Sequence, residues 1–207
     1  MSDLSLPLKI LLIAPPFLLA VILHEIAHGL VAYRLGDDTA ARAGRLTLNP
    51  LSHVDPMGSV ALPLLLLAVG SPYVFGWAKP VPVNFGRLPN PQRDMVKVAV
   101  AGPATNVVLA IAFAAAAHVC HGLGWPLPTY MMSYGVVINI VLAVFNLIPI
   151  LPLDGGRVLF GLLPREPALA FARLEPYGMF IVMGLLFTGA LNAVLSPITT
   201  MLLRVLL

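Results

Sequence analysis

The stretch LKILLIAPPFLLAVILHEIAHGLV, residues 8–31, joins a run of apolar residues to a pattern of potential metal ligands. About 20 apolar residues suffice to cross a bilayer as a helix, so this stretch can span it, with a kink expected at the proline pair 15–16. Residues four apart share one face of a helix, so His24 and His28 can occupy two corners of a tetrahedral zinc site. Glu25, beside them, can take a proton from water. The stretch therefore predicts hydrolytic metal chemistry inside an apolar segment.

The composition of the whole chain agrees with a membrane protein. Of its 207 residues, 59% are hydrophobic and 10% are charged, and the mean hydropathy is +0.93. A soluble protein carries about 25% charged residues. The net charge of +3 rests on few charges without a basic run, so we expect a lipid bilayer as the partner and no nucleic acid.

We expect an all-α polytopic membrane protein that forms a single domain over residues 1–207. Four spans are predicted at residues 8–31, 95–118, 131–151 and 177–203. Residues 56–75 are also apolar but contain two glycines and two further prolines after Pro56. The prolines of residues 76–94 forbid a long helix and favour extended structure. The fold class is thus four to six transmembrane helices, a re-entrant hairpin and a short extended or β segment.

Basic residues are distributed unevenly along the chain. Ten of the twelve lie in or beside three polar segments: Arg34, Arg42 and Arg45; Lys79, Arg87, Arg93 and Lys97; and Arg157, Arg165 and Arg173. The loop at 119–130 has none. By the positive-inside rule the three basic segments face the cytoplasm, and the 119–130 loop lies outside the cell (inner or plasma) membrane.

This topology requires residues 56–75 to begin and end on the same side. We therefore predict that the stretch enters the membrane and returns, which protein contacts permit for irregular backbone. A complete span that violates the charge rule is the alternative.

A catalytic zinc site needs a third protein ligand. His118 and His121 fall at the outer end of their span, on the wrong side. Asp154 is the better candidate because it follows two helix-breaking prolines and precedes two glycines in NLIPILPLDGG, residues 146–156. The alternative is that Asp154 only caps the next helix.

Depth in the membrane favours the ligand role for Asp154. At 1.5 Å per residue, His28 lies about 9 Å and His24 about 15 Å below the cytoplasmic end of the first span. Asp154 ends a span that runs in the same direction. The predicted site therefore holds one Zn²⁺ per chain, near the cytoplasmic side.

These motifs resemble the site-2 protease family of intramembrane zinc metalloproteases. HEIAH in an apolar span and the NxxPxxPLDGG run carry the resemblance, and GWAKPVPVN (76–84) and AGPATN (101–106) resemble segments of its short prokaryotic branch. The resemblance covers roughly residues 18–160 and implies the same three metal ligands, with Glu25 as the general base. We expect a member without appended regulatory domains.

The other polar residues are interpreted one by one, and most have two interpretations. The Asn146 amide could stabilise the oxyanion of the transition state, a role that rests mainly on the resemblance, or could join two helices. Asn139 is interpreted as packing or pathway lining, and Asn106 as a hydrogen-bonding contact between packed helices near the site. His53 is either a group at the mouth of the site or an ordinary loop histidine.

The predicted function is zinc-dependent endopeptidase activity on transmembrane substrate proteins. A substrate helix must unwind locally, and residues 79–85 could pair with the unwound strand. One alternative is a membrane zinc-handling protein, either a transporter or a sensor. Against it, the ionisable groups within the spans cluster at one depth. The other is an inactive protease-like scaffold, which the intact Glu25 disfavours.

Overall fold

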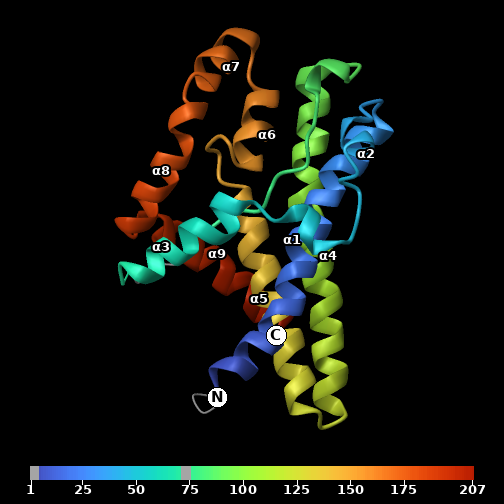
Figure 1. The fold of residues 1–207 in the computed structure, drawn as a ribbon, viewed down its shortest axis with the longest axis vertical. Helices are drawn as coiled ribbons and strands as arrows, with labels where there is room; N and C mark the ends of the chain where they lie inside the picture. Colours follow the sequence, from blue (N-terminus) through green and yellow to red (C-terminus); the bar gives the residue numbers. More distant parts are fainter. Residues whose placement is uncertain (1–4, 71–75) are drawn as a thin grey trace.

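The structure is a computed structural model that describes residues 5–70 and 76–207, and every regular element in those residues is helical. Three long helices, α1 (Leu6–Arg34), α4 (Pro91–Gly122) and α5 (Pro126–Asn146), lie side by side along the long axis of the molecule (Figure 1). Among the described residues these three are long and apolar enough to cross a membrane. The prediction of an all-α membrane protein is confirmed.

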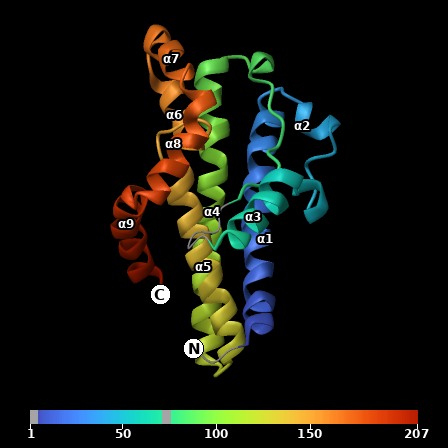
Figure 2. The same cartoon turned by 60° about the vertical axis from the view of Figure 1, so that its left-hand side comes forward.

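The shorter helices surround this bundle. They are α2 (Thr39–Arg42), α3 (Leu62–Ala68), α6 (Asp154–Leu162), α7 (Arg165–Ala172), α8 (Glu175–Phe187) and α9 (Ala190–Leu206), with single turns at η1 (Pro50–His53) and η3 (Phe85–Arg87) and a π-helical η2 (Pro56–Ala61). Figure 2 shows α4 and α5 between α1 on one side and α6 to α8 on the other. The pair α7 and α8, bent by 65°, is the one candidate for a fourth span in the described part of the chain.

Small residues hold α4 and α5 close together. Ala110 and Ala114 of α4 pack on Val136 and Ile140 of α5, and all four are buried. Without a hydrophobic drive between helices in lipid, such close packing supplies most of the association energy.

The structure differs from two predicted spans. The helix predicted at 131–151 runs from Pro126 to Asn146, because Pro149 and Pro152 lack the N–H groups that would continue it. The single span predicted at 177–203 is two helices, α8 and α9. Gly189 breaks them apart in the left-handed conformation, with φ of 76°, which glycine adopts without steric penalty.

Residues 56–68 form one short apolar helix, built from η2 and α3. It is too short to cross a bilayer. The chain then comes back to the start of this helix, where the Trp77 N–H donates to the Gly58 carbonyl at 3.2 Å. Residues 71–75, part of the predicted re-entrant hairpin, lie outside the described residues, and entry into the membrane stays a prediction.

Residues 76–84 were expected to be extended or β structure; the segment contains no strand, so the β alternative is not found. Pro80 and Pro82 cannot donate to a ladder. Loop carbonyls and side chains hold the segment instead. The Lys79 N–H donates to the His53 carbonyl at 2.9 Å, and the Arg45 guanidinium donates to the Lys79 carbonyl at 2.7 Å.

Asp37, in the loop after α1, anchors the far end of the same segment. Its carboxylate accepts from the Asn84 N–H at 2.6 Å and from the hydroxyl and N–H of Thr39. Burial alone raises the pKa of Asp37, but these hydrogen bonds and the nearby Arg87 charge outweigh it and hold the pKa below its ordinary value of 3.8. The Asp37 carboxylate is therefore charged at neutral pH, and its hydrogen bond to Asn84 ties residues 76–84 to the end of α1.

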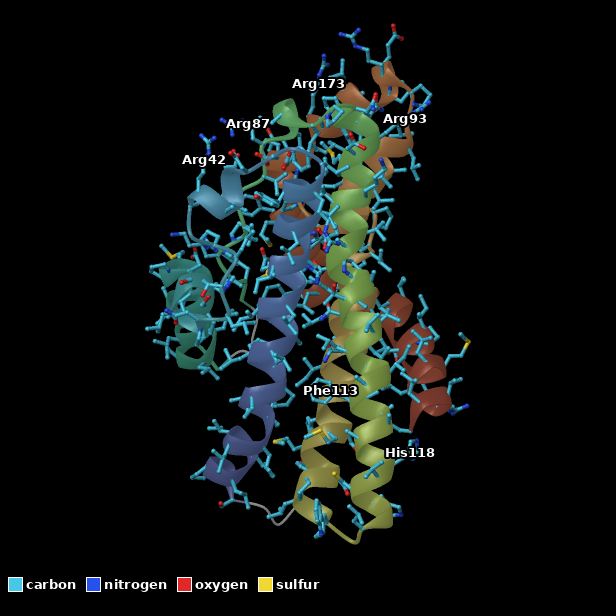
Figure 3. All side chains as sticks on the ribbon, turned by 90° about the vertical axis from the view of Figure 1, so that its right-hand side faces the viewer. Arg42, Arg87, Arg93, Phe113, His118 and Arg173 are labelled. Carbon is cyan, nitrogen blue, oxygen red and sulfur yellow. The ribbon has the colours of Figure 1, made fainter. Side chains whose placement is uncertain are left out.

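Basic side chains gather at one end of the bundle. Figure 3 shows Arg42, Arg87, Arg93 and Arg173 at this end, whereas His118 lies toward the opposite end.

Candidate metal centre

Three side chains from two distant parts of the chain converge inside the bundle. His24 and His28 come from α1 and are only 7% and 9% exposed. Asp154 is the first residue of α6. The two Nε2 atoms are 3.1 Å apart, and the Asp154 carboxylate lies 3.1 Å from His24 Nε2 and 3.3 Å from His28 Nε2.

These distances suit a zinc ion. Ligands at zinc bond lengths of about 2.0–2.1 Å sit roughly 3.3 Å apart at the corners of a tetrahedron. The observed separations are 3.1 to 3.3 Å. Two imidazole nitrogens and a carboxylate oxygen are also donors that zinc accepts.

The hydrogen bonds of the two histidines leave lone pairs at the centre. His28 Nδ1 lies 2.7 Å from the Val98 carbonyl, which can only accept, so Nδ1 carries the proton. His24 Nδ1 lies 2.5 Å from Asn106 Oδ1 in the same way. In the neutral rings both Nε2 atoms therefore present lone pairs to the carboxylate.

Such a cluster of acceptors repels itself unless a cation joins it. Asp154 Oδ2 is one such acceptor without a donor. It is buried and has no hydrogen-bond donor in the described part of the chain. Its short approach to His24 is a contact between two acceptors when the ring is neutral. The donor set fits Zn²⁺ better than it fits the metal-free protein.

The turn between α5 and α6 aims Asp154 at the histidines. A Cβ atom on Gly155 would lie 2.2 Å from the Leu147 carbonyl oxygen, and one on Gly156 would lie 2.4 Å from the Leu151 nitrogen. Only glycine permits the first turn of α6 to fold back so tightly. The capping position of α6 belongs to Leu153, and Asp154 faces the histidines.

Gly102 of α4 brings a helix backbone against the two histidines. A Cβ atom there would lie 2.5 Å from His28 Nε2 and 2.6 Å from His24 Nε2. Sequence reasoning did not assign this glycine to the site. Its signal was a Gly-Pro pair inside an otherwise regular apolar span.

Glu25 is held by the segment that follows the short apolar helix. Its Oε2 accepts from the Val81 N–H at 2.7 Å, and Val81 is buried against α1 near Gly29. The Val81 backbone thus steadies the carboxylate next to the histidines, and within residues 5–70 and 76–207 its other oxygen has no hydrogen-bond partner. Val81 was not a predicted site residue.

The other predicted or ambiguous groups make hydrogen bonds of their own away from His24, His28 and Asp154. The Asn146 amide donates to Leu142 O in its own helix at 3.0 Å, and within residues 5–70 and 76–207 it has no hydrogen bond to the three ligands. His53 is buried in its loop, 2.9 Å from the Thr47 carbonyl. His118 lies 3.2 Å from the Leu206 carbonyl.

Comparison with known proteins places the chain among metalloproteases. The profile described as "Peptidase family M50" matches residues 126–189. The chain is 37% identical over 182 residues to a Bacillus subtilis (strain 168) protein provisionally named zinc metalloprotease YwhC, covering 84% of this chain and 80% of that protein. It is 34% identical over 189 residues to a Mycolicibacterium smegmatis protein provisionally named zinc metalloprotease Rip2, covering 88% and 69%. No solved structure matches the chain.

Proposed function

The chain belongs to peptidase family M50, the site-2 protease family, as a multi-pass zinc metalloprotease, and from this premise we propose that it hydrolyses peptide bonds of transmembrane proteins within the bilayer. The observation that carries the proposal is the buried His24, His28 and Asp154 cluster. It lies where helices long enough to span a membrane meet.

Each residue of the site has a proposed role. His24, His28 and Asp154 would hold the ion. When bound, Zn²⁺ supplies a Lewis acid that polarises a carbonyl and makes water a nucleophile near neutral pH. Glu25 takes the proton from the attacking water and passes it to the leaving amine, while the Val81 N–H keeps its carboxylate in place.

Asn146 takes a supporting role in this proposal. Its amide now donates within its own helix, and a change of rotamer would release it for the substrate carbonyl or the oxyanion. Its position at the last residue of α5, just before the turn that carries Asp154, supports this role.

In the proposed orientation the protein lies in the cell (inner or plasma) membrane, with the metal centre toward the cytoplasmic side. The arginines at one end of the bundle, seen in Figure 3, support it through the positive-inside rule. His24 and His28 lie in the half of α1 that leads to this end, since α1 ends at Arg34.

The extended segment before α4 is proposed to bind the unwound substrate. Replacing residues 79–85 with a flexible Gly/Ser stretch should strongly reduce cleavage and leave zinc content unchanged. The replacement removes an ordered edge for the substrate and the rigid proline backbone around the Val81 N–H. Cleavage of a single-span substrate and zinc content are the measurements.

The control is a Gly/Ser replacement of residues 121–125, the last two residues of α4 and the loop that follows, at the opposite end of α4. It should leave cleavage intact. Full activity of the 79–85 variant would remove this segment from the mechanism.

The function itself is tested by metal removal with a panel of single-span proteins. The purified protein in detergent should cleave at least one of them, lose this activity after chelation and regain it with Zn²⁺. A zinc-handling protein would move or sense zinc without cleaving any of the panel, and that result would overturn the proposal.

A further inference from the structure

Two asparagines are buried completely among the apolar helices, and the mechanism above uses neither. Asn106 of α4 and Asn139 of α5 are both 0% exposed. An amide inside a membrane protein is unfavourable unless its donors and acceptors are satisfied, so such residues point to a role.

The two side chains form a hydrogen-bonded chain that ends on a metal-centre histidine. Asn139 Nδ2 donates to the Gly135 carbonyl at 2.8 Å. Asn106 Nδ2 donates to Asn139 Oδ1 at 2.8 Å and to the Ala20 carbonyl at 3.2 Å. Asn106 Oδ1 then lies 2.5 Å from His24 Nδ1.

The direction of this chain follows from its ends. The carbonyls of Gly135 and Ala20 only accept, so they fix the NH₂ side of each amide. Asn106 must therefore present its oxygen to His24. That oxygen accepts the Nδ1 proton, which leaves the Nε2 lone pair directed toward His28 and Asp154.

We propose that Asn106 is a positioning residue for metal binding, which, with Asn139 behind it, sets the tautomer and ring orientation of His24. The inference rests on the proposed function in one respect, that His24 is a metal ligand. Groups behind a ligand often orient it and raise its basicity. The hydrogen-bonded chain also connects α1, α4 and α5, so the site is complete only when these three helices are packed together.

The two histidines differ in how they are set. His28 Nδ1 is oriented by the Val98 backbone carbonyl, which no side-chain substitution removes. The orientation of His24, in contrast, depends on the side chain of Asn106. Changes at Asn106 should therefore affect His24 and spare His28, which makes His28 an internal reference.

The first measurement is zinc affinity of the whole protein in detergent, by competition with a chelator of known affinity. Asn106→Leu should weaken zinc binding by about 10- to 100-fold. Asn106→Asp keeps an oxygen that accepts from His24 Nδ1 and should stay within about threefold of wild type, below that range. Asn139→Leu leaves Asn106 tied to Ala20 O and should fall between the two.

The second measurement is NMR of the zinc-loaded protein with ¹⁵N-labelled histidine. Wild type should show protected Nδ1–H signals from both His24 and His28. Asn106→Leu should lose the His24 signal and keep that of His28, and Asn106→Asp should restore the His24 signal. Asn192→Leu, an exposed position on α9, is the matched control and should change neither signal nor affinity.

The outcomes separate the two proposals. If His24→Ala binds zinc as tightly as wild type, the proposed metal site is wrong. If His24→Ala loses zinc but Asn106→Leu keeps both wild-type affinity and the His24 signal, the positioning role is overturned. If Asn106→Leu does not fold, the other two variants test the positioning role. The inference fails if Asn139→Leu has the zinc affinity of wild type and Asn106→Asp has lost the His24 signal.

Discussion

Glu25→Gln is expected to lower peptide hydrolysis by about 100- to 10,000-fold, the usual contribution of a general acid–base group, and to leave zinc bound. Glutamine is nearly isosteric with glutamate, and its amide oxygen can still accept from the Val81 N–H. The loop contact and the three ligands therefore remain, and only the capacity to take and return a proton is lost. Cleavage of a single-span substrate and zinc per chain measure the two effects.

The matched variant is His24→Ala, which should lose zinc and activity together. Glu25→Gln also separates the competing functions, because zinc transport or sensing would survive it. Substantial cleavage by Glu25→Gln would contradict the assigned role of Glu25, and loss of zinc would make Glu25 part of the metal centre.

Gly102→Ala is expected to prevent zinc binding, although it adds a single methyl group outside the ligand set. The added Cβ would lie 2.5 Å from His28 Nε2 and 2.6 Å from His24 Nε2, well inside van der Waals contact. Either the rings rotate away or α1 and α4 separate, and both movements disperse the ligand atoms. The loss of zinc affinity should be larger than the decrease of about 10- to 100-fold that is usual when a group that orients a ligand is removed.

Gly122→Ala is the control for this substitution. It lies on the same helix, and an added Cβ would meet nothing within 4 Å. It should bind zinc and cleave substrate as wild type does. Full zinc binding by Gly102→Ala would mean that the two helices are farther apart at this level than the structure shows.

Local patterns predicted much of this protein. Apolar runs long enough to span a bilayer identified the three helices of the bundle, although not all of their ends. The errors came at breaks that depend on single residues. Residues 177–203 read as one apolar helix, and Gly189 divides them because the left-handed turn is available to glycine.

The interpretation of the polar residues was less complete. Asn106 was expected to join packed helices near the site, which it does, but its hydrogen bond to His24 itself was not predicted. Asn146 was expected to stabilise the oxyanion or to join two helices; its amide donates within its own helix, and the catalytic role stays a prediction. A polar residue in a span signals that a partner exists, while the partner depends on how the helices are rotated.

The sequence by itself determined what helical periodicity determines: membrane helices, and two histidines four residues apart on one face beside a glutamate. Tertiary structure alone decided which other groups meet them. Motif and depth predicted Asp154 as a partner of the histidines, but only the structure shows the contact: Asp154 is 126 residues from His28 along the chain and reaches the histidines through a turn that two glycines permit. Gly102, Val81 and Asn106 contact the site through helix packing and loop return. Periodicity repeats within one helix, so it carries no information about the distance or rotation between helices, and those two quantities determine which groups complete the site.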